Sequence, residues 1–199
     1  MVSESKIVQH RERAVPEEAS SILQEGLVAH VGFTIKDRPH VIPVSYFYDV
    51  SKPDRIYIHG GKTSRMMQHL ASGAQVCVEV TLLDGLIYSR SAKYHSMNYR
   101  SVICFGKGRT FENGDEKAEV LKQAIERYFP GRQEGRDYQK APAEHLVATI
   151  LVEIQIEEWS AKAREGGPRG PIDSDPTAEG TCGIQLTTSA GRTFFDSHG

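Results

Sequence analysis

Cysteine and tryptophan are scarce in this sequence, and long apolar runs are missing. No apolar stretch approaches 18 residues, so the 199-residue chain has no candidate transmembrane helix. Its three cysteines are odd in number and lack CxxC spacing, which predicts reduced thiols rather than a disulfide framework. The 24 lysines and arginines nearly balance the 26 acidic residues, unlike the basic surface of a nucleic-acid-binding protein. The first 13 residues lack the apolar core of a signal peptide, so we expect a cytoplasmic protein without membrane or nucleic-acid partners.

Short strands and turns dominate the hydrophobic pattern. Residues 27–35 alternate apolar with polar or small side chains, and a turn at 36–39 leads into a second strand, 40–49. Further strands are predicted at 55–59, 75–83, 101–111, 148–157 and 182–188, and helices at 16–25, 63–71, 116–128 and 143–146, with Asn113 near the start of the third helix. Hairpins outnumber strand–helix alternations, which favours a mainly β fold, a closed or partly closed antiparallel barrel. We expect an N-terminal arm (1–15), one domain (16–164) and a loop-rich C-terminal extension (165–199).

The segment 59–65, with the sequence HGGKTSR, carries the strongest chemical signal. It follows the apolar strand 56–58 and runs into a predicted helix. Two glycines, then Lys62, two hydroxyl residues and Arg65, supply backbone and side-chain donors suited to a phosphate monoester. The pattern therefore predicts a site for a phosphorylated small molecule or cofactor.

Two other segments are less specific. Pro43 interrupts the second strand, so it marks either a harmless strand edge or backbone left open to a planar ligand. The polar and aromatic segment 94–102 either faces solvent or lines a polar ligand. The histidines His69, His95 and His145 lack metal-ligand spacing, and no HExxH, GxSxG or Walker A motif occurs, so we predict no metal site.

Taken together, these segments resemble the pyridoxamine 5′-phosphate oxidase-like FMN-binding split barrels, and most closely the flavin-nucleotide-binding and nitroimidazole-reductase-like branch. The resemblance rests on the order of four pieces across residues 17–164. They are the strand 41–46 (VIPVSY), the strand and turn 56–65 (IYIHGGKTSR), the segment 98–102 (NYRSV) followed by Gly106, and a late strand ending near Trp159, Lys162 and Arg164.

This resemblance implies a six-stranded split barrel that forms a homodimer, with FMN in clefts built by both subunits. It implies that Ser64 and Arg65 hold the FMN phosphate with Lys62 nearby, and that His59 lies near the flavin ring and contacts the substrate. The cofactor-binding residues carried over are Pro43, Val44, Ser45, His59, Lys62, Ser64, Arg65, Asn98, Tyr99, Arg100, Ser101 and Trp159, and the substrate-pocket residues are His59, Tyr94 and His95.

The chain also departs from the biosynthetic oxidase. It has His40 and Ser45 where that enzyme carries Arg and Lys, and residues 194–199 lack its Arg-x-His signature, so we do not expect vitamin B6 synthesis. The expected function is an FMN-dependent oxidoreductase that passes electrons from reduced FMN to a small organic acceptor, with no catalytic side chain identified. A non-catalytic flavin-binding or sensing protein and a split-barrel haem-binding protein are the alternatives, and a deazaflavin in place of FMN stays open.

Overall fold

The computed structural model describes residues 6–110 and 114–187. The predicted Asn113 cap, the end of the predicted last strand at Thr188 and residues 188–199 of the extension lie outside these ranges. The elements in chain order are η1 (Arg11–Arg13), η2 (Pro16–Glu18), α1 (Ala19–Glu25), β1 (Ala29–Ile35), β2 (Arg38–Val44), β3 (Phe47–Tyr48), β4 (Arg55–Gly61), α2 (Arg65–Ala71), β5 (Gln75–Tyr88), η3 (Ala92–Tyr94), β6 (Ser96–Thr110), α3 (Gly114–Tyr128), α4 (Ala143–Ala148), β7 (Thr149–Arg164) and β8 (Gly183–Leu186).

One antiparallel sheet forms the body of the molecule. Its strands follow the order β2-β1-β5-β6-β7-β4-β3, and β8 pairs with β5 outside this path. The sheet curls without closing, because β2 and β3 remain unpaired with each other at its two ends. The prediction of a mainly β split barrel is confirmed, but the sheet has eight strands rather than six. The two-residue β3 and the four-residue β8 account for the difference.

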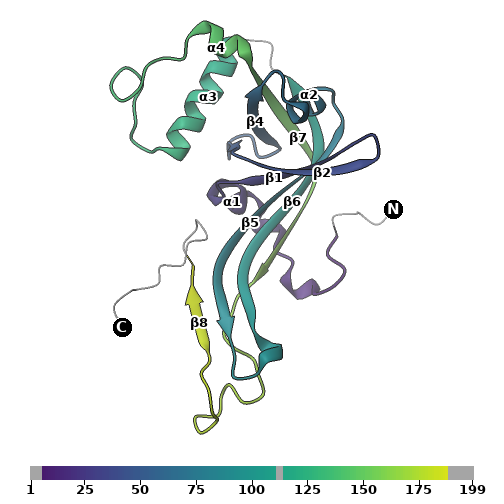
Figure 1. Ribbon diagram of the computed structural model, residues 1–199, viewed down its shortest axis with the longest axis vertical. Helices are drawn as coiled ribbons and strands as arrows, with labels where there is room; N and C mark the ends of the chain where they lie inside the picture. The colour runs from purple at the N-terminus through teal and green to yellow at the C-terminus, as the bar shows by residue number, and fades with distance from the viewer. Residues whose placement is uncertain (1–5, 111–113, 188–199) are drawn as a thin grey trace.

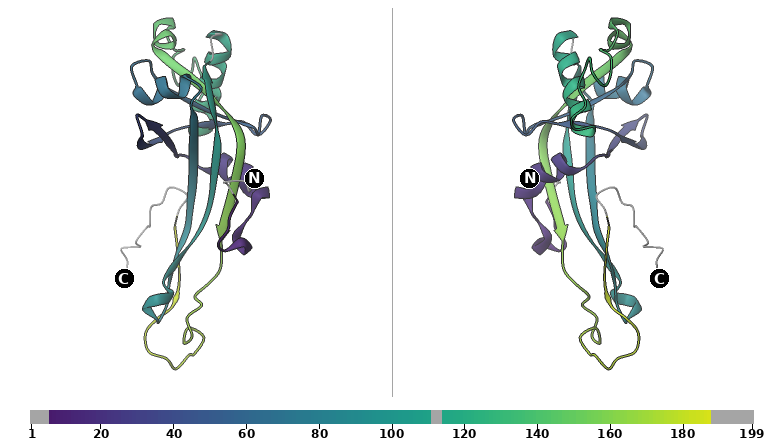
Figure 2. Two further views of the ribbon diagram at one scale, coloured as in Figure 1. Left: turned by 90° about the vertical axis from the view of Figure 1, so that its right-hand side faces the viewer. Right: turned by 90° about the vertical axis from the view of Figure 1, so that its left-hand side faces the viewer.

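The central strands are much longer than their apolar patterns predicted. Strands β5, β6 and β7 span 14, 15 and 16 residues and run along the long axis of the molecule (Figures 1 and 2). A register shift between Leu83 and Gly85 lets β5 continue past the end of its alternating pattern. The polar segment before Ser101 is strand as well, because β5 and β7 pair with it on either side. The β5–β6 hairpin thus forms an arm that extends beyond the barrel.

The core lies between the curled sheet and the helices α1 and α2. Ile22, Leu23, Met67 and Leu70 from these helices are fully buried against the inward-facing residues of the strands. Gly26 allows the close contact after α1, because a Cβ at this position would clash with the side chain of Val80. Burial of these apolar side chains supplies the main stabilisation of the fold.

Helix α3 is attached to the same end of the barrel as β4. Its Arg127 donates hydrogen bonds to the carbonyl oxygens of Leu23, Gln24 and Gly26, which close the C-terminal end of α1. The ring of Tyr46 lies 4.6 Å from the Arg127 guanidinium carbon, a cation–π contact. These bonds hold α3 over the cavity described below. Within the described ranges, no helix is long and apolar enough to cross a membrane.

Candidate functional site

The HGGKTSR segment joins the end of β4 to the start of α2. Gly60 lies against α2, because a Cβ here would come within 2.8 Å of Met67 Cγ, whereas a Cβ at Gly61 would meet nothing within 4 Å. Ser64 caps α2, and its hydroxyl accepts a hydrogen bond from the Met67 backbone N–H at 3.4 Å. The helix begins at Arg65, two residues later than predicted, and has only seven residues. The cations around this turn, rather than the dipole of so short a helix, therefore dominate its electrostatics.

Three cationic side chains occur around this turn. Lys62 and Arg65 are exposed, and neither lies within 4.0 Å of a carboxylate of the described residues. Lys117 of α3 donates to the carbonyl oxygens of Leu146 and Thr149 at the α4–β7 junction. Burial, and secondly the charge of Lys62, lowers the pKa of Lys117. The turn is thus a positive region in which Lys62 and Arg65 form no ion pair with the described acidic residues.

An apolar cavity of about 470 Å³ lies between α3, α4 and the β4 end of the sheet. Leu121, Ile125 and Tyr128 of α3 form one wall together with Phe129, which follows the helix. The remaining lining residues include the predicted flavin contacts Ser45 and His59, and also Tyr46, Ala124, Ala141, His145, Leu146 and Thr149. The volume falls within the range of about 300–1,000 Å³ that is usual for small-molecule and cofactor sites.

His59 lies on β4 and stays accessible to water at the mouth of this cavity. The cavity walls nevertheless exclude enough water to lower the pKa of its imidazole, because desolvation penalises the charged form. The ring is therefore neutral near pH 7, and one of its nitrogens is available as an acceptor or ligand.

A second cavity of about 340 Å³ adjoins the apolar one. It is lined by Lys62 and Lys117, and the two cavities share Leu146 and Thr149. Lys117 and the α3 wall were not predicted as site residues, because they come from a helix far from β4 in sequence. One signal of this wall was detectable in the sequence, namely the apolar stripe of the helix. The stripe continues to Phe129, which is 57% exposed. An apolar compartment therefore lies directly beside a basic one.

Pro43 and Val44 lie in β2, at one end of the strand order. Of the two alternatives left open for Pro43, this position agrees with a strand edge, and it does not test whether a planar ligand lies along the backbone. Only Ser45 of this predicted trio lines the apolar cavity; Pro43 is exposed and Val44 is half-buried against the core. The contact of Pro43 and Val44 with a flavin remains a prediction.

The segment 98–101 lies on β6, away from Lys62 and Arg65. Tyr99 pairs with Arg164 at one end of β7, whereas Gly61 of β4 pairs with Thr149 at the other end. Arg100 forms ion pairs with Asp84 at 2.8 Å and Glu25 at 2.6 Å. These two carboxylates occupy its guanidinium, so in this structure Arg100 is not available to a phosphate.

The remaining residues of this segment contact β7. Asn98 is buried and its Oδ1 accepts a hydrogen bond from Arg164 at 2.6 Å, and the Ser101 hydroxyl donates to the Lys162 carbonyl oxygen at 3.4 Å. The Tyr99 ring lies 5.9 Å from Lys162 Nζ. Four predicted cofactor residues thus share one location, which is distant from the basic turn of the same chain.

Tyr94 and His95 lie at the η3 turn, at the far end of the β5–β6 arm from α2, α3 and α4 (Figure 1). They do not meet His59 within one chain, so a shared substrate pocket remains a prediction for an assembly of two chains. Trp159 is half-buried on β7, packs against the core and lines a shallow cavity with the N-terminal segment around Arg11 and Pro16.

Comparisons with known proteins agree with the curled open sheet. The family model described as pyridoxamine 5′-phosphate oxidase matches residues 16–163. The chain therefore belongs to the pyridoxamine 5′-phosphate oxidase family. A search of curated proteins gave no match.

Two solved structures are similar over most of the chain. The flavocytochrome Anf3 from Azotobacter vinelandii shares 28% identity, with 94% of this chain and 85% of that chain covered and a TM-score of 0.79. The FAD- and haem-binding protein from Mycobacterium smegmatis shares 30% identity, with 87% and 82% covered and a TM-score of 0.75. Both alignments must continue past residue 163 into the C-terminal extension, because residues 1–163 alone are too few for such coverage.

A third structure shares the fold at lower identity. It is a candidate 5-nitroimidazole antibiotic resistance protein from Bacteroides thetaiotaomicron, with 21% identity, 76% of this chain and 90% of that chain covered, and a TM-score of 0.61. The split-barrel resemblance expected from the four sequence segments is confirmed.

Proposed function

We propose that this chain is a flavin-binding oxidoreductase that passes electrons between reduced FMN, or the FMN portion of a larger flavin, and a small organic acceptor. The observation that carries the proposal is the adjoining pair of cavities, one apolar and bordered by His59, the other lined by Lys62 and Lys117. A flavin has the same two parts, a flat apolar ring system and a phosphate.

The basic turn fits the phosphate. Lys62 and Arg65 have no carboxylate partner among the described residues, and the Ser64 hydroxyl proton is free to donate while its oxygen caps α2. Charge-assisted hydrogen bonds contribute about 1.5–3 kcal/mol each, so three donors contribute about 4.5–9 kcal/mol to phosphate binding, which corresponds to a Kd from about millimolar to about micromolar. The open space above Gly61 leaves room for a phosphate oxygen near the backbone.

The apolar cavity fits a planar ring. A flavin supplies the redox chemistry when it is bound. The side chains of α3 exclude water from one side of the cavity, and Ser45 offers a hydroxyl at its edge. The neutral imidazole of His59 orients a substrate by a hydrogen bond and accepts or returns a proton at a ring nitrogen.

We further propose a homodimer with the cofactor at the subunit interface. Arg100, Ser101, Tyr94 and His95 lie too far along the arm to reach the basic turn of their own chain, so only a partner chain could bring them to a flavin. Exposed apolar side chains on the arm and on β8, which pairs with it, support such an interface; they are Leu86, Tyr88, Tyr94, Met97, Ile103, Ile184 and Leu186.

Haem binding is a second candidate, favoured by one specific observation. His59 and His145 line the same apolar cavity from different elements, and His59 is neutral because burial lowers its pKa. If haem were bound here, a neutral imidazole in this apolar pocket could hold its iron. The flavocytochrome and the FAD- and haem-binding protein, which are 28% and 30% identical to this chain, give independent support.

Absorption spectra of the purified chain after separate addition of FMN, FAD and haemin test both candidates. Flavin binding predicts quenched flavin fluorescence with saturation, and haem binding predicts a shifted Soret band that disappears in His59→Ala. Oxidation of NAD(P)H with nitroaromatic or quinone acceptors then separates an oxidoreductase from a non-catalytic flavin-binding or sensing protein. Failure to bind either flavin would disprove the main proposal.

A further inference from the structure

Helix α4 contributes to the walls of both the apolar cavity and the adjoining basic cavity, which is lined by Lys62 and Lys117. The helix has six residues and none of them is buried; Leu146 alone is half-buried. A helix of this length is not stable by itself, because isolated helices need roughly 12–15 residues. Contacts with other elements must therefore hold α4 against the two cavities.

The carbonyl end of α4 is held from outside the helix. The last carbonyl groups of any helix lack partners within it, so they need donors from elsewhere. The Lys117 ammonium of α3 donates to the carbonyl oxygens of Leu146 and Thr149. The Lys62 backbone N–H donates to the carbonyl oxygen of Ala148 at 3.1 Å. The position of α4 thus depends on α3 and on the basic turn.

The ammonium of Lys117 also faces the question of charge in the basic cavity. Lys62 is the other charged residue among the described lining, and Lys117 forms no ion pair with a described acidic residue. Two of its three protons go to the carbonyl oxygens of α4 and β7, and the third has no acceptor among the described residues. Burial, and secondly the charge of Lys62, lowers the pKa of Lys117. An anion in this cavity would accept the third proton and offset the charge of Lys62, which favours the ammonium form.

We propose that Lys117 is a positioning residue that couples the two cavities. An anion in the basic cavity stabilises the ammonium that holds the carbonyl end of α4, and α4 then completes the wall of the apolar cavity through His145 and Leu146. Such coupling is reciprocal, so a ligand in the apolar cavity also strengthens binding of the anion. The assignment of the two ligand parts to a flavin ring and a phosphate rests on the proposed function.

Riboflavin and inorganic phosphate, the separated parts of FMN, test the coupling. Flavin fluorescence quenching of the full chain gives the riboflavin Kd with and without phosphate, at constant ionic strength kept with chloride. In the wild type, saturating phosphate is expected to lower this Kd about fivefold, the low end of usual coupling between sites. Phosphate is raised to saturation in each variant, so that a weaker phosphate affinity alone does not remove the effect.

Three variants separate positioning from loss of charge. Lys117→Met should bind riboflavin with the same Kd in the presence and absence of phosphate. Lys122→Met is the matched control, because Lys122 is an exposed lysine of the same helix, and it should keep the full phosphate effect. Lys117→Arg retains the charge with a different donor geometry and should recover part of the effect.

Amide hydrogen exchange gives a readout that needs no flavin. Phosphate is expected to slow exchange in α4 of the wild type and of Lys122→Met, but not in α4 of Lys117→Met. The β5–β6 arm is the internal reference, since it extends away from α4 (Figure 1), and its exchange should not change. Circular dichroism and melting temperature verify folding. If Lys117→Met does not fold, the wild-type exchange comparison and Lys117→Arg carry the test.

A riboflavin Kd that phosphate leaves unchanged in the wild type would overturn the inference, and so would equal phosphate effects in the wild type and Lys117→Met. A chain that binds neither riboflavin nor FMN, but whose α4 is protected by phosphate through Lys117, would disprove the proposed function and leave the coupling of Lys117 to α4 intact.

Discussion

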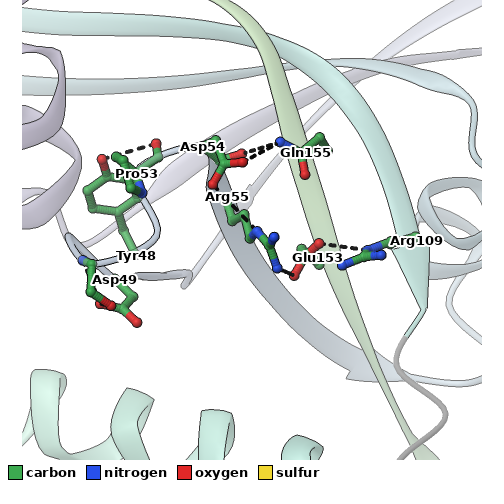
Figure 3. Close-up of polar contacts among 9 residues, drawn as sticks. Tyr48, Asp49, Pro53, Asp54, Arg55, Arg109, Glu153 and Gln155 are labelled. Atoms are coloured by element: carbon green, nitrogen blue, oxygen red, sulfur yellow. Dashed lines mark hydrogen bonds and ion pairs between the residues drawn. The ribbon is translucent and has the colours of Figure 1, made fainter.

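Arg109 Nε lies 2.7 Å from Oε1 of Glu153, a carboxylate whose side chain is completely buried (Figure 3). Arg55 Nη1 donates to the other oxygen at 3.1 Å, so strands β4 and β6 both contact this residue of β7. Two cations on a buried carboxylate satisfy it without a cofactor. We therefore assign this network to the stability of the open sheet, and not to binding.

Glu153→Gln is expected to lower the free energy of unfolding by about 2 kcal/mol, because it removes the charge from a buried, doubly hydrogen-bonded site whose arginine partners are partly solvated. Glu157→Gln is the matched control on the same strand, since Glu157 is exposed and pairs with Lys107 at 3.4 Å. Urea unfolding measures both. An equal loss in the two variants would refute the structural role of Glu153.

Gly106→Ala and Gly61→Ala are expected to behave in opposite ways. A Cβ at Gly106 would clash with the Gln155 backbone at the irregular β6–β7 pairing, so we expect a loss of about 1–3 kcal/mol in the free energy of unfolding. A Cβ at Gly61 meets open space, so its stability change should stay within about 0.5 kcal/mol. Thermal unfolding tests the pair, and a destabilised Gly61→Ala would show that this turn is packed more tightly than described.

Arg65→Gln and Lys62→Gln should each weaken FMN binding by about tenfold, the loss expected for one charge-assisted contact to phosphate. Flavin fluorescence quenching gives the Kd, and unchanged melting temperatures of the apo variants confirm that the loss is local. Riboflavin, which lacks the phosphate, is the matched ligand control and should bind both variants as it binds the wild type. Equal losses for riboflavin and FMN would argue against a phosphate site.

The lowered pKa of His59 predicts a pH dependence of stability. As pH falls through the ordinary imidazole value of about 6.5, the unfolded chain takes up a proton that the folded chain binds more weakly. The free energy of unfolding should therefore decrease below about pH 6.5 and be insensitive to His59 above it. Because the ring retains contact with water, the slope should be shallow.

Urea titrations between pH 5 and 8, compared for the wild type and His59→Gln, isolate this term as the difference between the two curves. His30→Gln, at an exposed histidine that pairs with Glu79, is the control. A difference curve that is flat across the whole range would show that the imidazole is not desolvated in the folded chain.

Hydrophobic periodicity predicted most of the strands, because alternation of apolar side chains reports which face of a strand is buried. The hairpin β1–β2, the strand β7 and the helix α3 were all expected from this pattern. It underestimated β5, β6 and β7, whose outer segments are held as strands by pairing with one another and with β8. Cross-strand hydrogen bonds of this kind leave no periodic signal in either segment alone.

The candidate site was likewise predictable from the sequence only in part. The anion-binding character of Lys62, Ser64 and Arg65 is evident from a short contiguous motif, because neighbouring donors in a chain remain neighbours in the fold. The tertiary structure decided whether Arg100 is available to a ligand. Two carboxylates distant from it in sequence, those of Asp84 and Glu25, form ion pairs with its guanidinium. No local pattern could distinguish it from Arg164, which has no such partner among the described residues.

Residue order alone determined the family, the mainly β architecture and the basic turn, since each can be recognised from short motifs and alternating patterns along the chain. Only the tertiary structure decided that α3 walls an apolar cavity at His59, that the arm carries residues 94–101 away from the basic turn, and that Lys117 lies at the carbonyl end of α4. Long-range packing brings these groups together or separates them, and the free energy of that packing is a property of the whole fold.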